Sequence, residues 1–182
     1  MFQRLALIVT VALLAVTTAC SSSSSSTVNA AAATGTAAAS AAATACPTSN
    51  TKSFAKTRFV ADVALAGGAF KRYIYSPAKD GKFKKGAKGK VLALVKAAAA
   101  GAFTINRLKA ASEAAQANPT LCKLLAQPIA KFSAAVSGLI SKAKSGSINP
   151  ADVTSPDGLL SDLHGAASQG GAAFKDNTNT SA

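Results

Sequence analysis

One segment, residues 119–146, carries large apolar side chains at every third or fourth position, and this period constrains the fold more than any other feature. The apolar positions are Leu121, Leu125, Ile129, Phe132, Val136 and Ile140. At about 3.6 residues per turn they share one face, so the segment is predicted to be an amphipathic helix that needs partners to cover that face. Asn118 followed by Pro119 marks the start of this helix, and Gly146 marks its end.

Three further segments have the same helical period. Their apolar positions are Phe59, Val63, Gly67, Phe70 and Ile74 in the first, Leu94, Ala98, Gly101, Ile105 and Leu108 in the second, and Leu159, Leu160 and Leu163 in the last. No stretch shows the alternation between turn signals that is typical of strands. We therefore predict an all-α domain over residues 46–170, a small up-and-down bundle of about four helices, followed by a flexible tail at residues 171–182.

Individual residues indicate how these helices begin, end and pack. Ser53 or Thr51 is expected to cap the first helix, and Ser76-Pro77 to end it. Gly67-Gly68 is expected to let a neighbouring helix approach closely, which would offset the poor helix propensity of glycine. Residues 90–118 are nearly apolar all round, so this helix is predicted to be the most buried. Its charged residues leave an apolar run too short to span a membrane.

The first 20 residues have the pattern of an export signal. Arg4 precedes an apolar run of twelve residues, 5–16, which is too short to span a bilayer but suits a signal peptide. Thr17-Thr18-Ala19 and then Cys20 follow. This resembles the lipobox of bacterial lipoproteins, in which small residues precede a cysteine that is acylated and becomes the mature N-terminus. Thr17 stands where that family usually has leucine.

The resemblance implies a signal peptide at residues 1–19, acyl chains such as palmitate on Cys20, and anchoring to the bacterial cell membrane on its extracytoplasmic side. Ordinary cleavage, for example after Ala30, is the alternative and would give a secreted protein. Residues 21–45 contain only Ser, Thr, Ala, Gly, Val and Asn. Residues 20–45 are therefore predicted to consist of a lipidated Cys20 followed by a disordered low-complexity tether that spans about 25–30 Å. Such tethers look most like those of actinobacterial surface lipoproteins.

The chain has three cysteines, and the export signal bears on their state. If Cys20 carries lipid, Cys46 and Cys122 remain, and an oxidising compartment favours a disulfide between them over two free buried thiols. Two distant cysteines and a single histidine, His164, are too few for a metal-ligand set. We expect neither a metal nor a cofactor.

Positive charge is concentrated in one part of the chain. Residues 52–109 carry 14 basic and 2 acidic side chains, whereas residues 110–182 carry five of each, so the first segment holds +12 of the formal net charge of +13. Its densest stretch is a predicted loop. This loop and a nearby arginine supply the candidate anion-binding residues: Arg72, Lys79, Lys82, Lys84, Lys85, Lys88 and Lys90. A solubilising role is the alternative, although solubility requires no such asymmetry.

The export signal and the type of cation together indicate the partner. Tyr73, Tyr75 and Phe83 lie near the lysines, a combination typical of nucleic-acid binding, but export argues against nucleic acid. Outside the cytoplasm the abundant polyanions are anionic lipid headgroups and wall polymers. Lysine, a compact point charge, suits diffuse attraction to such surfaces, whereas arginine suits shaped recognition of phosphate. We therefore expect binding to anionic envelope components, and the sequence indicates no protein partner.

The sequence lacks the residue patterns that catalysis needs. Residues 81–88, GKFKKGAK, come close to a phosphate-binding P-loop, but Ala87 replaces its lysine and no Ser or Thr follows. The acids form no close pair in an apolar setting, His164 stands alone, and no nucleophile elbow occurs. We predict a non-catalytic protein. Two alternatives are a surface structural or interaction protein and a carrier of an apolar ligand, with Gly67-Gly68 and Gly101 lining a slot between helices.

Overall fold

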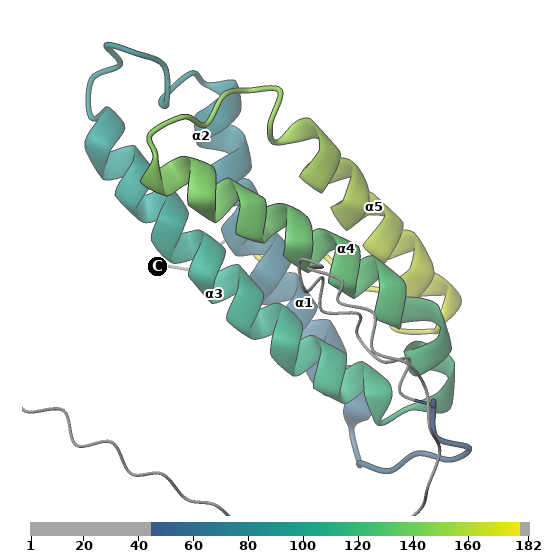
Figure 1. Ribbon diagram of the computed structural model, residues 1–182. Coiled ribbons are helices and arrows are strands. Elements are labelled where there is room, and N and C mark those ends of the chain that lie inside the picture. The colour runs from purple at the N-terminus through teal and green to yellow at the C-terminus, as the bar shows by residue number, and fades with distance from the viewer. Residues whose placement is uncertain (1–44, 179–182) are drawn as a thin grey trace, which may run out of the picture. The chain divides into compact units, whose positions relative to one another are not determined.

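The computed structural model describes residues 45–178, which form a bundle of helices (Figure 1). The elements are α1 (Ala55–Phe70), η1 (Lys71–Tyr75), α2 (Ser76–Lys79), α3 (Lys90–Gln116), α4 (Pro119–Lys144) and α5 (Thr154–Gln169). The first three run on as one rod, so the bundle consists of four rods that alternate in direction (Figure 1). No strand occurs in this range, which confirms the predicted all-α fold. The predicted signal peptide, Cys20 and most of the predicted tether lie outside the described residues.

The core uses the predicted faces of α1, α4 and α5, whereas three of the five residues of the predicted α3 stripe, Leu94, Ala98 and Ile105, are only half-buried. α3 packs against both α1 and α4, and α5 packs against α4. All the apolar positions predicted on α4 are buried except Ile140, which is half-buried against the same core. Phe70 and Phe132 meet edge to face in the centre, with ring centroids 5.4 Å apart. Burying side chains of this size contributes about 1.5–3 kcal/mol each.

The first rod extends one turn beyond its predicted end. It continues through Pro77 to Lys79, although proline lacks an N–H and its ring collides with the carbonyl four residues earlier. The wider π-helical turn η1 precedes the proline, and the Ser76 N–H donates to the carbonyl of Lys71, five residues back. A widened turn relieves such a collision. The N-caps predicted for this rod, Ser53 or Thr51, are also wrong, because its N-cap is Phe54, with a left-handed φ of 59°.

The nearly apolar composition of α3 predicted that it would be the most buried helix, but it is not. It buries 8 of its 27 residues, whereas α1 buries 8 of its 16. The inner face of α3 uses alanine and glycine for close packing, and Gly101 lies so near Ile140 that a Cβ would be 2.5 Å from its Cγ1. By length and composition both α3 and α4 could cross a membrane, so the length argument against a span does not hold. Core helices of soluble proteins often meet the same criterion.

A disulfide joins Cys46 to Cys122, as predicted, with the two Cα atoms 5.7 Å apart. Hydrogen bonds reinforce this attachment, since the Thr51 N–H donates to the Ala117 carbonyl at 2.9 Å and Asn118 Nδ2 donates to Asn50 Oδ1 at 2.7 Å. The chain therefore enters the bundle at the corner where α3 ends and α4 begins.

Residues 171–178 fold back onto α1 and α5, in contrast to the expected flexible tail. The Asn177 N–H donates to the carbonyl of Ala64 at 2.8 Å, and Phe174 lies edge to face with Phe59 at 6.4 Å. Gly67-Gly68 makes this contact possible, because a Cβ on either glycine would overlap Asp176 or Asn177. The two glycines thus accommodate the returning tail, where we had expected a neighbouring helix.

Candidate functional site

The lysine loop, residues 79–90, has a defined backbone made of successive turns. The Gly81, Lys84 and Ala87 N–H groups each donate to the carbonyl three residues earlier, at 3.1 Å. Gly81 and Gly86 adopt φ values of 71° and 81°, which L-residues with a side chain rarely adopt. The glycines seen in the sequence therefore shape turns, and the loop follows a helix rather than the strand of a P-loop.

Phe83 anchors the lysine loop to the core. Its side chain is only 2% exposed, whereas its neighbours Lys82 and Lys84 are exposed. The same turn thus buries the aromatic ring and directs the lysines outward. In the sequence, Phe83 together with Tyr73 and Tyr75 resembles the aromatic residues of a nucleic-acid-binding surface. Its burial removes it from that role.

The lysine loop carries charge that the bundle does not neutralise. Five of its six lysines are exposed, and Lys90 is half-buried. Within residues 45–178 none of the six forms an ion pair, whereas other cations do: Lys71 pairs with Asp157, and Arg107 with Asp62 at 3.3 Å. Lys79 lies 5.7 Å from the centre of the Tyr75 ring, a cation–π contact that leaves its charge in place. Asp80 is the one acid in the loop.

Arg72, which the sequence analysis grouped with the lysine loop, has a different role. Its Nη1 donates to the carbonyl of Thr178 at 2.7 Å, and its guanidinium lies 5.6 Å from the Tyr73 ring. Arg72 therefore helps to hold the returning tail. Arg72 keeps its charge, but because it contacts the tail, the six lysines of the loop are the stronger anion-binding candidates.

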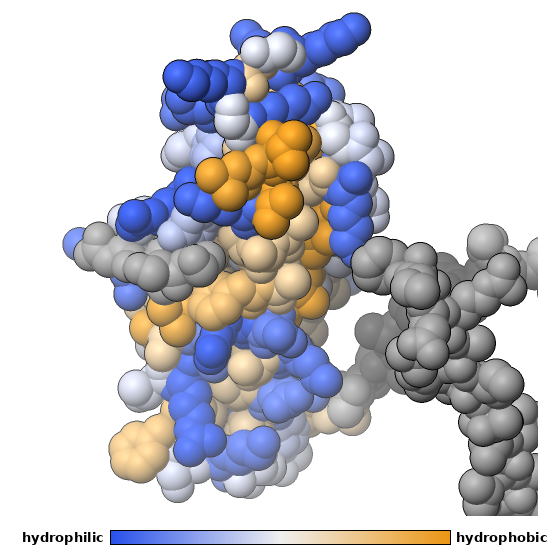
Figure 2. Space-filling view, turned by 90° about the vertical axis from the view of Figure 1, so that its left-hand side faces the viewer, coloured by the Kyte–Doolittle hydropathy of each residue, from blue (hydrophilic) through white to orange (hydrophobic). Residues whose placement is uncertain are grey.

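An exposed apolar patch adjoins the lysine loop and was missed by the sequence analysis. Val91, Leu92 and Val95, at the start of α3, are 76%, 59% and 60% exposed. Figure 2 shows a hydrophobic patch bordered by hydrophilic side chains on the side of the bundle that carries α3. A partial signal was present in the sequence, because Leu92 lies off the Leu94–Ala98–Gly101 stripe that was predicted to face the core.

A second group of titratable side chains gathers where the tail meets α5. His164 Nε2 lies 3.4 Å from Asp176 Oδ1, its Nδ1 lies 2.9 Å from the Leu160 carbonyl, and its ring stacks on Phe174 at 4.0 Å. Burial raises the pKa of Asp176, although His164 and Lys71 oppose the shift. Both ring nitrogens of His164 therefore face protein oxygens, one from α5 and one from the tail. This group fastens the tail.

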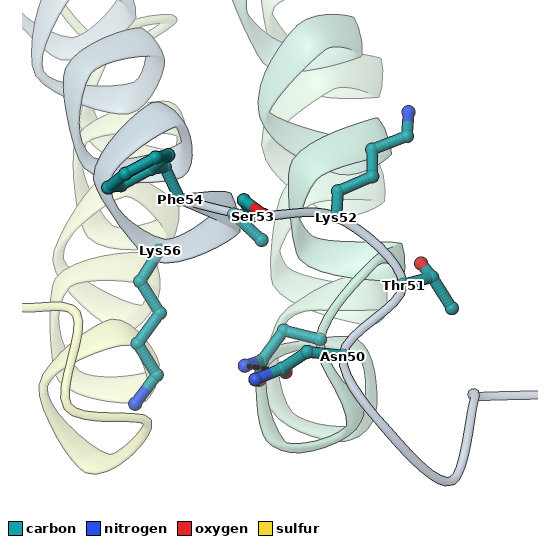
Figure 3. Close-up of a pocket in the computed structure, with 8 residues that line it drawn as sticks. Asn50, Thr51, Lys52, Ser53, Phe54 and Lys56 are labelled. Atoms are coloured by element: carbon teal, nitrogen blue, oxygen red, sulfur yellow. Dashed lines mark hydrogen bonds between the residues drawn. The ribbon is translucent and has the colours of Figure 1, made fainter.

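The bundle offers shallow depressions at its surface. The larger has a volume of about 400 Å³ and is lined by residues 50–56 and Asn118, where the chain enters the bundle. Its side chains are mainly polar, and those of Lys52, Phe54 and Lys56 extend outward in different directions (Figure 3). The glycines proposed to line an apolar slot are instead covered, Gly101 by Ile140 and Gly67-Gly68 by the tail.

Among the described residues, no group of three or more His, Cys, Asp or Glu side chains lies close enough together to hold a metal ion. No protein family, characterised protein or solved structure matches the chain.

Proposed function

We propose that this chain is a non-catalytic, lipid-anchored protein of the bacterial cell envelope, and that its lysine loop binds anionic envelope components, either lipid headgroups or wall polymer. The proposal places the body outside the cytoplasm, held by acyl chains on Cys20. The export pattern of residues 1–20 and the disulfide between Cys46 and Cys122 support that location, because disulfides persist in oxidising compartments.

The single observation that carries the binding proposal is the set of unpaired, outward-facing lysines at one end of the bundle. Phe83 and the three turns hold these lysines on a fixed framework. From Gly81 to Ser112 the sequence has no acidic residue to repel an anionic surface. A lysine close to such a surface contributes about 1 kcal/mol, an attraction that acts over about 8 Å at physiological salt.

The proposed tether is long enough for this contact. The chain enters the bundle at Cys46, and the lysine loop lies at the far end of α3, a 27-residue helix and so about 40 Å away. Cys20 and Cys46 are 26 residues apart, which corresponds to at most about 90 Å of extended chain. The loop end can therefore turn back to the membrane that holds the anchor, or face the wall.

Neutralising the loop lysines tests the binding proposal. Lys82, Lys84, Lys85 and Lys88 are changed together to glutamine in the mature chain. Their side chains are exposed, so we expect an unchanged circular dichroism spectrum and melting temperature. Binding to anionic vesicles or anionic wall polymer should weaken, with a shallower dependence on salt, since fewer counterions are released.

A charge-matched variant is the control for this experiment. Lys52, Lys109, Lys123 and Lys131 are also exposed but lie outside the loop, and their change to glutamine removes the same charge. The proposal predicts that this variant retains much more binding than the loop variant. Equal binding of both variants would show that net charge alone matters, and unchanged binding of the loop variant would make the loop a solubilising surface.

A further inference from the structure

The apolar patch of Val91, Leu92 and Val95 is contiguous. Val95 follows Val91 by four residues and Leu92 by three, which are the spacings that bring side chains together on one helix face. Exposed Ala99 and Ala102 continue the same face along α3. Single exposed apolar residues are common, whereas contiguous apolar patches rimmed by polar residues are typical of surfaces that bind a protein, a membrane or a ligand.

Cations border this patch. Lys88 and Lys90 precede it, Lys96 lies beside Val95, and the rest of the lysine loop adjoins it. An apolar centre with a lysine border is the pattern of a protein surface that enters the interface of an anionic bilayer, where lysine stems lie along the apolar phase and their ammonium groups reach the headgroups.

The apolar centre distinguishes among the anionic partners. A wall polymer or a nucleic acid offers charge but no apolar phase, so Val91, Leu92 and Val95 would gain nothing from it. A second copy of this chain could cover the patch, but it would bring two lysine loops together and their charges would repel. Charge complementarity therefore favours an anionic phospholipid bilayer.

We propose that the start of α3 inserts Val91, Leu92 and Val95 into the acyl region of an anionic phospholipid bilayer, while the lysine loop binds the surrounding headgroups. This inference rests on the proposed function, because the loop supplies the electrostatic attraction, and it names the bilayer as the partner. The bundle then lies with the loop end of α3 against the membrane, a position that the proposed tether can reach.

A tryptophan reporter tests insertion directly. The chain has no tryptophan, so Leu92→Trp introduces a single one at the centre of the patch. On addition of vesicles of phosphatidylglycerol and phosphatidylcholine, its emission should shift to the blue and be quenched by brominated acyl chains. The matched reporter is Phe54→Trp, at another highly exposed position, 77%, at the opposite end of the bundle, and its emission should not shift.

Removing the apolar patch separates insertion from charge attraction. The combined variant Val91→Ser, Leu92→Ser and Val95→Ser should bind these vesicles roughly tenfold to a hundredfold more weakly, yet bind a soluble anionic polymer as the wild type does. Circular dichroism checks that each variant is folded. The fluorescence of the Leu92→Trp variant, which lacks the serine changes, measures insertion independently.

Each outcome supports or overturns one of the two proposals. Suppose that the serine variant binds vesicles as the wild type does and that the Leu92→Trp variant shows no blue shift. Insertion would then be overturned, and the proposed function would stand. A blue shift that appears without vesicles and grows with protein concentration would also overturn insertion, because a second copy would cover the patch. Failure of the lysine-loop variant to weaken any binding would instead overturn the proposed function.

Discussion

Gly68 shows at the scale of one residue how the tail depends on a missing side chain. A Cβ at this position would overlap the carbonyl of Asn177. Gly68→Ala should therefore displace the tail, although alanine ordinarily improves a helix by up to about 1 kcal/mol. We expect the Asn177 amide to lose its protection from hydrogen exchange, and the free energy of unfolding not to rise.

The control for this change is Gly138→Ala on α4. Gly138 is exposed, and within the described structure no atom lies within 4 Å of the added Cβ. This variant should gain up to about 1 kcal/mol in stability and keep the tail docked. If Gly68→Ala stabilised the protein equally, with Asn177 still protected, the assigned role of Gly68 would be wrong.

Asp176 should make tail docking depend on pH. Burial raises its pKa, so the docked state holds the proton more tightly than the unfolded state, whose pKa is near 3.8. Docking is then most favourable at low pH and weakens as pH rises through the raised pKa. Protection factors of the Asn177 amide, measured across this range, should fall with rising pH. Asp176→Asn removes the titrating group, and an unchanged pH profile in that variant would contradict this account.

At the scale of elements, the disulfide fixes the start of the domain to the first turn of α4. Cys46 and Cys122 are separated by 76 residues, and the chain-entropy model gives a bridge of this length an upper value of about 4 kcal/mol. Changing both cysteines to serine should lower the melting temperature, and peptide mapping without reductant should recover the linked pair. Two alkylatable thiols in the native protein would refute the bridge.

The helices were predictable because apolar periodicity records burial, and α4 illustrates this best. The disulfide was predictable because the predicted export signal, with Cys20 predicted to carry lipid, left Cys46 and Cys122 as one pair. The docked tail was not, since its contacts, such as the Phe174 ring on Phe59 and the Asn177 N–H on the Ala64 carbonyl, leave no period in the sequence. The widened turn before Pro77 was not predictable either, because a proline in the sequence normally indicates that a helix ends.

The positive charge of the candidate site was predictable from the sequence, but its three-dimensional shape was not. Counting lysines located the loop, yet its fixed shape depends on Phe83, whose burial results from tertiary packing. The exposure of Val91, Leu92 and Val95 was missed because composition does not show which face of an apolar helix meets a partner. Arg72 was assigned to the loop by proximity in sequence, although the returning tail takes up its guanidinium.

At the scale of the whole molecule, the bundle has two distinct ends. One holds the disulfide and the point where the chain enters, and the other holds the lysine loop and the apolar patch. We propose that a lipid on Cys20 attaches the protein through the first end, and that the second end binds an anionic surface. The two modes differ in their response to salt, because acyl chains resist it and lysine attraction is screened.

Membrane fractionation in a bacterial host, with low-salt and high-salt washes, tests both assignments in one measurement. Wild type should stay with the membrane in both washes. Cys20→Ala, exported on an ordinary cleavable signal peptide, should stay at low salt and leave at high salt. Adding the four lysine-to-glutamine changes of the loop should release it in both washes. Release of the wild type by the high-salt wash would contradict the lipid anchor, and retention of the combined variant at low salt would contradict binding through the lysine loop.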